Sequence, residues 1–315
     1  MFVAITGASG FLGSHTLAAL RRAGHRVRAL SRTRDEAIDD DADEWCIGDQ
    51  YDHKMQAQFV DGADAVIHAA IDWSALNEGP LPNLDVNLTG TLRLSESARA
   101  AGVHQFLFVS SLEVYFQSPR IGALTEADAV WPASIYGAFK ASVELHLKAY
   151  HASYGMSASA WRPASMYGPH PTFENTQWLD LIRRVARGET IADATAVHMV
   201  HVQDVAEALA LAIGDESTAG EFFNLVDVPV TWDSVARVAA DLTTSSARIE
   251  AHSSAPTPPA FDASKAIEFC ERHGNHTALR RGLEGVRQHV RWVWESLQRD
   301  GSLDRRTQTA EGLHE

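Results

Sequence analysis

The sequence opens with three glycines at a spacing of three residues, and this feature constrains the fold more than any other. Gly7, Gly10 and Gly13 follow an apolar run, Phe2 to Ile5, and precede an alanine- and leucine-rich stretch, Leu12 to Ala23. The run predicts a buried strand and the stretch predicts a helix. Strand, glycine turn and helix form the context in which a dinucleotide-binding fingerprint occurs.

Each glycine of the turn has its own expected task. Gly7 makes the tight turn, Gly10 lets the backbone approach a pyrophosphate, and Gly13 allows the helix to pack closely on the strand. The pyrophosphate would lie over the helix N-terminus, where backbone N–H groups are free to donate. The spacing Gly-x-x-Gly-x-x-Gly differs from the commoner Gly-x-Gly-x-x-Gly. The predicted cofactor contacts of this turn are Gly7, Ser9, Gly10, Phe11, Leu12 and Gly13.

The composition of the chain argues against several classes of binding partner. The chain has 315 residues, enough for a large core and for one or two domains. Its formal net charge of -14 argues against nucleic acid or an anionic membrane as partner. The two cysteines, Cys46 and Cys270, form no Cys-x-x-Cys pair, which makes a zinc site or a disulfide framework unexpected. Without a cleavable leader or a membrane-spanning apolar run, we expect a cytoplasmic protein that binds a small molecule.

The second predicted strand, His25 to Leu30, ends where a dinucleotide site selects its cofactor. In an NAD site an acidic residue usually ends this strand and holds the adenosine ribose hydroxyls. Here Ser31 and Arg32 stand at that position, and Arg34 follows. An arginine with a small hydroxyl residue suits a 2′-phosphate through charge-assisted hydrogen bonds. The sequence therefore favours NADP(H), with NAD(H) as the alternative.

Further strands extend the predicted cofactor site. Asp49 follows a short strand at 45–47 and could accept from the adenine amino group. His68 ends a strand at 64–68, and Ala69 and Ala70 then leave room for a nucleotide against the backbone. The acidic stretch 35–44 predicts a solvated surface. Residues 83–101 predict a long helix, and 105–110 a central parallel strand.

Ser110 and Ser111 end that central strand, and a tyrosine and a lysine follow on a helix predicted over 134–150. Tyr136 and Lys140 are four residues apart and therefore share a helix face. A phenol has a pKa of about 10, and we expect the nearby ammonium to lower it. A serine hydroxyl from the strand end can hold a substrate oxygen while its charge changes. This set suits proton transfer coupled to hydride transfer, although Tyr-x-x-x-Lys pairs also occur on many helices by chance.

Together these motifs resemble the extended short-chain dehydrogenases/reductases of the nucleotide-sugar epimerase/dehydratase group. The resemblance covers nearly the whole chain, in the stretches Thr6 to Gly13, His68 to Ala70, Asp85 to Thr91, Ser110-Ser111, Tyr136 to Lys140, Arg162-Pro163, Tyr167 to Pro169, His201 to Ala206 and Thr277 to Leu283. It implies an α/β fold, a doubly wound parallel sheet (Rossmann) with a small C-terminal substrate-binding lobe. The Rossmann domain would span 1–165 and recur in roughly 196–228, the lobe 166–300, and a polar tail 301–315.

The resemblance also implies roles for individual residues. Tyr136 would be the general base or acid, and Lys140 would orient the nicotinamide ribose. The family's catalytic Ser or Thr lies four residues before a second tyrosine, here Tyr115, which selects Ser111. Asn87 and Pro163 join Tyr136 and Lys140 as implied cofactor contacts. Expected substrate contacts are Trp73, Leu112, Glu113, Met166 and Tyr167, with His170 or Trp178 as further candidates. A homodimer through the helices 83–101 and 134–150 is implied as well.

Two departures from the family's pattern bear on the substrate. Members that bind a nucleotide diphosphate usually carry an arginine at the position of Val197, and a second one in the region of 253–261, which here has no basic residue. Because an anionic diphosphate needs such donors, we expect a substrate without a nucleotide: a sugar, sugar acid or other secondary alcohol or carbonyl compound. His198 and His201 would point to opposite faces of a strand, so we expect no metal site. Asp204 is expected to be a helix N-cap.

The expected activity is that of an NAD(P)-dependent dehydrogenase or reductase. An epimerase would hold NAD tightly and return the hydride, which Ser31 and Arg32 disfavour. A dehydratase usually has an acidic pair after its Ser or Thr, and here Leu112 and Glu113 supply only half of it. A nucleotide-sensing regulator on the same fold often lacks the tyrosine or the lysine, and both are present in this chain.

Overall fold

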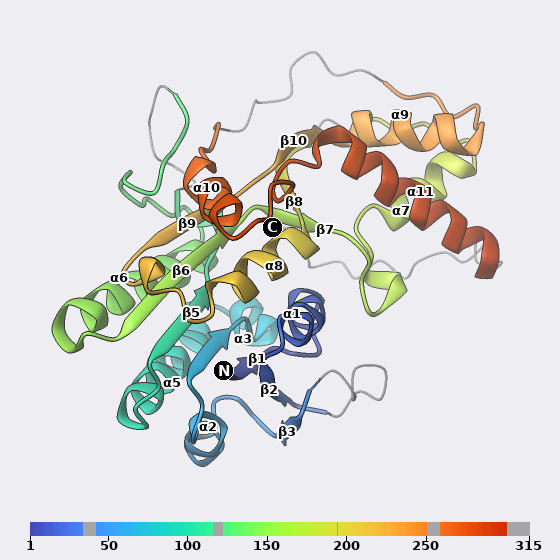
Figure 1. Cartoon of the computed structure of the whole chain (residues 1–315). Coiled ribbons are helices and arrows are strands. Elements are labelled where there is room, and N and C mark those ends of the chain that lie inside the picture. Colours follow the sequence, from blue (N-terminus) through green and yellow to red (C-terminus); the bar gives the residue numbers. More distant parts are fainter. Residues whose placement is uncertain (34–41, 116–121, 194, 251–258, 301–315) are drawn as a thin grey trace. The chain divides into compact units, whose positions relative to one another are not determined.

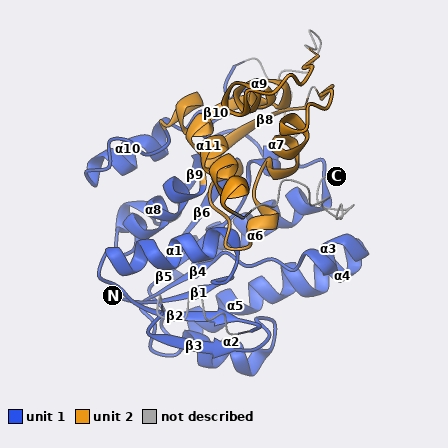
Figure 2. Cartoon of the chain, turned by 90° about the vertical axis from the view of Figure 1, so that its right-hand side faces the viewer, with its two compact units in different colours: residues 1–164, 202–226, 259–279 blue, residues 165–201, 227–258, 280–315 orange. Residues whose placement is uncertain are grey.

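The computed structural model describes residues 1–33, 42–115, 122–193, 195–250 and 259–300 (Figure 1). Arg34, most of the acidic stretch 35–44, the middle of the region 244–261 and the polar tail 301–315 lie outside the described residues. The chain divides into two compact units, residues 1–164, 202–226 and 259–279, and residues 165–201, 227–258 and 280–315 (Figure 2). The strand predicted near 196 belongs to the second unit, so the chain returns to the first unit at residue 202.

The first unit is built on a seven-stranded sheet of order β3-β2-β1-β4-β5-β6-β9. Every neighbouring pair in it is parallel. Its strands are β1 (Phe2–Thr6), β2 (Arg26–Ser31), β3 (Glu44–Ile47), β4 (Ala65–His68), β5 (Gln105–Val109), β6 (Ser157–Pro163) and β9 (Phe222–Leu225). The strand order reverses between β1 and β4, and in a doubly wound sheet ligands bind outside the carboxyl ends of the strands at such a switch point.

Helices cover both faces of this sheet. Figure 2 shows α1 and α8 on one side and α2 and α5 on the other. The helices are α1 (Phe11–Arg22), α2 (His53–Val60), α3 (Trp73–Glu78), α4 (Pro80–Asn83), α5 (Thr89–Ala100), α6 (Ile135–Tyr154), α8 (Val202–Ala212) and α10 (Ser264–Arg272), with short helical turns η2 (Leu84–Leu88), η3 (Leu112–Tyr115) and η5 (Glu216–Thr218). Phe59, Leu94, Phe139 and Val143 from α2, α5 and α6 share one core cluster with Phe106 of β5. Central strands buried on both faces read as continuous apolar runs, as β5 does.

The glycine turn brings α1 against the strand that precedes it. A Cβ atom at Gly13 would lie 1.9 Å from the carbonyl oxygen of Gly7, and one at Gly7 would lie 2.9 Å from the backbone nitrogen of Ala70. Gly7 also has a φ of 71°, which favours glycine. The backbone of the turn therefore packs directly on its neighbours, as the spacing predicts.

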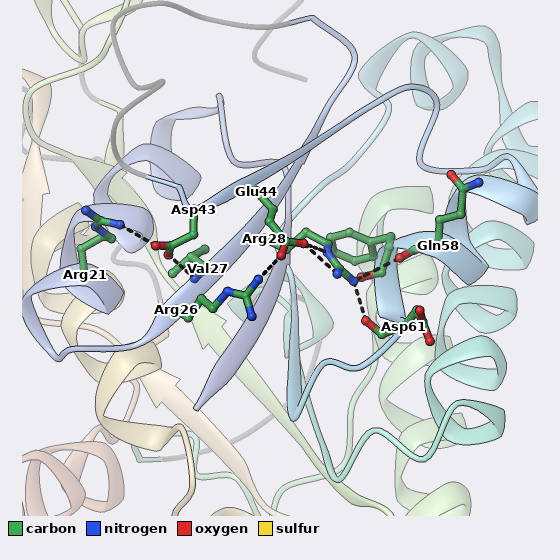
Figure 3. A network of polar contacts seen from close by, with 9 residues as sticks. Arg21, Arg26, Val27, Arg28, Asp43, Glu44, Gln58 and Asp61 are labelled. Carbon is green, nitrogen blue, oxygen red and sulfur yellow. Dashed lines mark hydrogen bonds and ion pairs between the residues drawn. The ribbon is translucent and has the colours of Figure 1, made fainter.

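A network of charged side chains holds the edge of the sheet (Figure 3). Arg28 of β2 donates to Glu44 of the edge strand β3, and also to the backbone carbonyls of Gln58, Phe59 and Asp61. Arg26 pairs with the same Glu44 carboxylate. Charged residues on an edge strand discourage pairing with other chains, and here they also fix β2, which ends at Ser31.

The second unit holds a three-stranded sheet of order β10-β8-β7. Strand β8 (Ala196–His201) pairs antiparallel with β10 (Val228–Thr231) and parallel with β7 (Ser165–Tyr167). The helices of this unit are α7 (Leu179–Ala186), α9 (Trp232–Thr243) and α11 (Gly282–Asp300), with a helical turn η4 (Phe173–Asn175). Its core contains Tyr167, Trp178, Ile182, Val235 and Val290.

Some local predictions were wrong. The helix expected over 83–101 is interrupted by a π-helical turn at Leu84–Leu88, which lies around Asn87. Asp204 is not an N-cap: α8 starts at Val202, and the buried Asp204 carboxylate accepts from the backbone N–H of Leu279. Leu279 has a φ of 59°, so Asp204 stabilises a strained backbone turn that no local sequence pattern reveals. Helices α2, α3 and α10 and strands β6, β7 and β10 are further elements that the sequence analysis did not predict.

Gly13→Ala should destabilise the protein, because the new methyl group meets a backbone carbonyl that cannot move away. We expect a loss of about 3 kcal/mol in the free energy of unfolding, measured by urea denaturation. The matched control is Gly48→Ala, whose Cβ would meet the terminal methyl group of Met55, the end of a flexible side chain. Its loss should stay below about 1 kcal/mol, and equal losses in both variants would contradict the close packing of α1.

Candidate active site

Ser111 and Tyr136 meet at the carboxyl end of β5. Ser111 is the second residue after this strand, and its side chain lies close enough to the phenol of Tyr136, near the start of α6, to affect the pKa of that phenol. Ser111 is 8% exposed, and its Oγ also accepts from the backbone N–H of Glu113 at 3.2 Å. The two hydroxyl groups are therefore held by neighbouring elements of the first unit rather than by a long loop.

Lys140 reaches the same strand end from one turn further along α6. Its side chain is 3% exposed, and Nζ donates to the carbonyl oxygen of Val109 at 2.7 Å. Nζ lies 5.5 Å from the centroid of the Tyr136 ring and 4.7 Å from that of Phe108. The structure thus brings Ser111, Tyr136 and Lys140 together, as the motif order predicted. A lysine ammonium has three N–H donors. Within the described residues one of them is used, by the Val109 oxygen, so two are left for a bound group.

The N-terminus of α6 is fixed against the segment that carries Ser111. Ser134 caps the helix by accepting from the N–H of Gly137 at 3.0 Å. A Cβ at Gly137 would lie 2.6 Å from the carbonyl oxygen of Glu113, so only glycine lets the helix approach this closely. The same Ser134 hydroxyl donates to the Glu113 carboxylate at 3.5 Å. These contacts set the position of Tyr136 relative to Ser111.

Burial dominates the electrostatics of the site. It raises the pKa of Tyr136 to about 12, although the neighbouring Ser111 side chain lowers this pKa, and the charge of Glu113 raises it further. Burial also lowers the pKa of Lys140 to about 7, against the charge of Glu144. The expectation that Lys140 lowers the pKa of the phenol is therefore wrong: this pKa is raised, because removal from water disfavours the charged phenolate. Burial likewise raises the pKa of Glu113.

A buried ion pair ties α6 to the neighbouring strand. Arg162 of β6 donates from Nε and Nη2 to the two carboxylate oxygens of Glu144, at 2.8 and 2.6 Å. Both side chains are 2% exposed or less, and Arg162 also donates to the hydroxyl of Tyr115. Tyr115 in turn donates to Asn224 of β9 at 3.1 Å. This network connects helix α6, the segment after Ser111 and two strands.

A second network positions the segment that follows β4. The Asn87 carboxamide accepts from the N–H of Asp72 at 2.8 Å and donates to the carbonyl oxygen of Asp72 at 2.9 Å. It also accepts from the hydroxyl of Tyr51 and donates to Asn83. Both donors and both acceptor positions of Asn87 are thus used, and the residue is fully buried. In this structure Asn87 clamps the backbone at Asp72; its predicted contact with a cofactor stays a prediction.

His68 is buried between two threonines. Its Nε2 lies 2.9 Å from the hydroxyl of Thr91, which donates to the carbonyl oxygen of Asn87, so Nε2 is the donor. Its Nδ1 then accepts from Thr6, 2.7 Å away, and Thr6 accepts from the N–H of Ala70. Burial, with the charge of Lys140, lowers the pKa of His68 to about 3. A neutral imidazole therefore links β1, β4 and α5 below the Ala69–Ala70 segment.

The glycine turn and its surroundings fit a dinucleotide. Gly10 precedes α1 without a side-chain cap, which leaves the first N–H groups of the helix to an anion. The Ser9 and Ser31 hydroxyls lie 2.9 Å apart, which joins the turn to the end of β2, and Arg32 after it is exposed. Ser110 follows Val109, whose carbonyl oxygen accepts from Lys140, and the Ser110 hydroxyl is buried without a partner among the described residues. The residues present therefore suit the group that the turn predicts.

The remaining residues that were predicted to contact cofactor or substrate differ in exposure and lie on different elements. Asp49 is exposed after β3 and accepts from the N–H of Tyr51, whereas Pro163 is buried at the end of β6. Leu112 is only 7% exposed, and Trp73 is 48% exposed. Met166 and Tyr167 belong to the second unit, so their role also stays a prediction. In the described ranges no group of histidine, cysteine or acidic residues could hold a metal ion, and no helix there could span a membrane.

Sequence reasoning missed the residues that hold the site together. Glu144 lies four residues after Lys140 on the same helix, and Arg162 is the charged residue of β6. A charged residue in each of these buried elements was therefore a usable signal. Tyr51 and Asp72 gave no such signal, because their contacts with Asn87 depend on the π-helical turn.

The comparisons with known proteins agree with this geometry. The model of the NAD dependent epimerase/dehydratase family matches residues 3–225. The UDP-glucose 4-epimerase of Mycolicibacterium smegmatis is 34% identical over 175 residues, which span 52% of this chain and 56% of that protein. The UDP-glucose 4-epimerase of Corynebacterium glutamicum is 29% identical over 248 residues, which span 71% of this chain and 75% of that protein.

Solved structures extend the similarity to almost the whole chain. MoeE5 in complex with UDP-glucose and NAD has a TM-score of 0.76 at 27% identity, with 94% of this chain and 100% of that chain covered. The dTDP-glucose 4,6-dehydratase DesIV from Streptomyces venezuelae, with NAD bound, has a TM-score of 0.75 at 25% identity, with 95% and 98% covered. The fold is thus shared by enzymes described as epimerases and as dehydratases.

Lys140 should make the stability of the ligand-free protein depend on pH. Its pKa falls from 10.5 to about 7 on folding, so between these values the unfolded chain binds more protons and the folded state gains stability as pH rises. Lys140→Met should flatten this gain between pH 7 and 10, measured by urea denaturation. Lys54→Met, at an exposed site on α2, should leave the gain unchanged. Equal slopes for wild type and Lys140→Met would contradict the burial of this amine.

Proposed function

The chain belongs to the NAD dependent epimerase/dehydratase family, and we propose that it is an NAD(P)-dependent oxidoreductase that acts on a secondary alcohol or carbonyl carbon of a sugar-like substrate. The observation that carries the proposal is the convergence of Ser111, Tyr136 and Lys140 at the end of β5. These groups supply a proton carrier, a hydrogen-bond donor for a substrate oxygen and an amine beside the phenol.

The chemistry of the residues follows from their protonation. With a pKa of about 12 the phenol of Tyr136 is protonated at neutral pH, so it can donate a proton to a carbonyl oxygen that gains negative charge. Ser111 can hold the same oxygen, since its side chain lies next to the phenol. A bound nicotinamide dinucleotide supplies or accepts the hydride. Lys140, with donors to spare, would hold the ribose hydroxyls of that group.

The glycine turn, Ser9, Ser31 and the Ala69–Ala70 segment would hold the rest of the dinucleotide. We propose that NADP(H) is preferred. An exposed arginine, Arg32, follows Ser31 at the end of β2, where an acidic residue would hold ribose hydroxyls in an NAD site. An exposed guanidinium can pair with a 2′-phosphate in a bidentate way.

The proposed substrate lacks a nucleotide. Val197 of β8 stands where a diphosphate-binding member usually has an arginine. Arg183, a fully buried cation of the second unit, is already paired with both carboxylate oxygens of Glu174. An anionic diphosphate needs charge-assisted donors, and the valine at position 197, with the pairing of Arg183 to Glu174, is what supports a substrate without a nucleotide.

A nucleotide-sugar epimerase that retains NAD is the second candidate. What favours it is the similarity to proteins described as UDP-glucose 4-epimerases. A non-catalytic regulator is disfavoured because the tyrosine and the lysine are both present and lie next to each other. A homodimer through α5 and α6 also stays a proposal; Leu145 of α6 is 63% exposed, as a residue of such an interface would be in one subunit.

Tyr136→Phe should lower turnover at least about 100-fold, because the phenol is the proton carrier, while cofactor affinity changes little. Turnover is measured by the absorbance of reduced nicotinamide, with a panel of sugars, sugar acids, carbonyl compounds and UDP-glucose. A Tyr136→Phe protein that keeps its activity would contradict the assigned role. Tight, saturable binding of UDP-glucose would favour the second candidate instead.

NADPH should bind more tightly than NADH, and Arg32→Ala should weaken NADPH binding about tenfold, by removing a charge-assisted contact to the 2′-phosphate. NADH binding should be unaffected. Both dissociation constants are measured by fluorescence titration of the reduced cofactors. Arg99→Ala, an arginine of α5 paired with Glu96, is the control and should change neither constant. Equal or tighter NADH binding by the wild type would contradict the preference.

A further inference from the structure

The indole of Trp73 lies against the ring of Tyr136. The two ring centroids are 5.5 Å apart, with 26° between the ring planes, so the rings are stacked. Trp73 nevertheless keeps 48% of its surface exposed. One side of the indole therefore covers the reactive phenol, and the remainder is open to whatever approaches Tyr136. Aromatic surface next to a few placed polar groups is typical of small-molecule sites.

The backbone that carries Trp73 is held in place. Trp73 is the first residue of α3, and the preceding Asp72 caps this helix by accepting from the N–H of Ala75 at 2.9 Å. The Asn87 carboxamide forms hydrogen bonds with both the backbone N–H and the backbone carbonyl of Asp72. Tyr136 is held independently, through the cap of α6 at Ser134. The stack thus joins two elements that are each fixed by their own hydrogen bonds, so the open indole is preorganised.

The charges around the stack are unfavourable for an anion. The negative charge of Glu113 acts on Tyr136, and Asp72 is the chain neighbour of Trp73. Lys140 is the cation near the phenol, but its amine is buried against the Val109 carbonyl. An aromatic face offers no hydrogen bond to a carboxylate or phosphate, whereas it packs well against carbon-bound hydrogens.

We propose that Trp73 is a specificity-determining residue of the site: its open surface takes the uncharged, C–H-bearing face of a ring substrate beside the reacting carbon. The substrate class is then a neutral cyclic alcohol or ketone such as a pyranose, and a ring with a carboxylate next to the reacting carbon is rejected. This inference rests on the proposed function, because it assumes that the substrate binds at Tyr136.

The test uses two matched probes, methyl β-D-galactopyranoside and the corresponding uronic acid glycoside, in which a carboxylate replaces the hydroxymethyl group. Their dissociation constants are measured by saturation-transfer NMR on the full chain saturated with NADP⁺, with irradiation of aromatic protons. The galactoside should bind, receive saturation on its ring protons, and bind at least about tenfold more tightly than the uronide.

Trp73→Ala should weaken galactoside binding about tenfold, which corresponds to the contact energy of an aromatic pair. Trp73→Phe should keep most of the affinity, because it keeps an aromatic face. The matched control is Trp131→Ala, which removes another exposed indole (61% exposed) and should leave binding unchanged. Unchanged affinity in Trp73→Ala, equal affinity for the two probes, or binding of neither would overturn the proposal.

The experiments distinguish a failure of the role proposed for Trp73 from a failure of the proposed oxidoreductase function. Activity that survives in Tyr136→Phe would overturn the oxidoreductase mechanism and leave the effect of Trp73 on binding intact. Normal binding by Trp73→Ala, with turnover that still requires Tyr136, would overturn only the role of Trp73.

Discussion

The contact between the Lys140 ammonium and the Val109 carbonyl is the interaction on which the rest of the site depends. It places an amine in the interior at the end of a buried strand, and the hydrogen bond offsets part of the cost of removing this amine from water. The contact holds α6 at the end of β5. It therefore also fixes the position of Tyr136, which lies one helical turn before Lys140. One turn later, the ion pair between Glu144 and Arg162 fixes the same helix against β6.

Hydrogen bonds also hold the segment that follows β4, the strand next to β1 at the switch point of the sheet. His68, between Thr6 and Thr91, and Asn87, between Tyr51 and Asp72, hold the end of β4 and the start of α3. Buried polar networks of this kind are stable only when their members are satisfied, and the carboxamide of Asn87 meets that condition. The glycine turn, the phenol and the indole are therefore all carried by backbone segments with fixed positions.

The sequence predicted what depends on local patterns. Gly13 predicted the close approach of α1 because only glycine allows it, and the order of Ser111, Tyr136 and Lys140 along the chain predicted that their side chains come together at the end of β5. It could not predict Asp204, whose partner Leu279 is distant in the chain, or the π-helical turn at Asn87, which tertiary hydrogen bonds stabilise. The pKa of Tyr136 was misjudged for a related reason: the depth of burial is a property of the folded chain rather than of a motif.

The central claim is that the phenol, the amine and the serine hydroxyl surround one position beside a bound nicotinamide. The most direct measurement is a crystal structure of the protein with NADP⁺ bound. The claim predicts the pyrophosphate over the glycine turn, and the nicotinamide ribose within hydrogen-bond distance of the side chains of Lys140 and Tyr136. A dinucleotide whose nicotinamide end lies away from the end of β5, or a cofactor bound elsewhere on the chain, would contradict it.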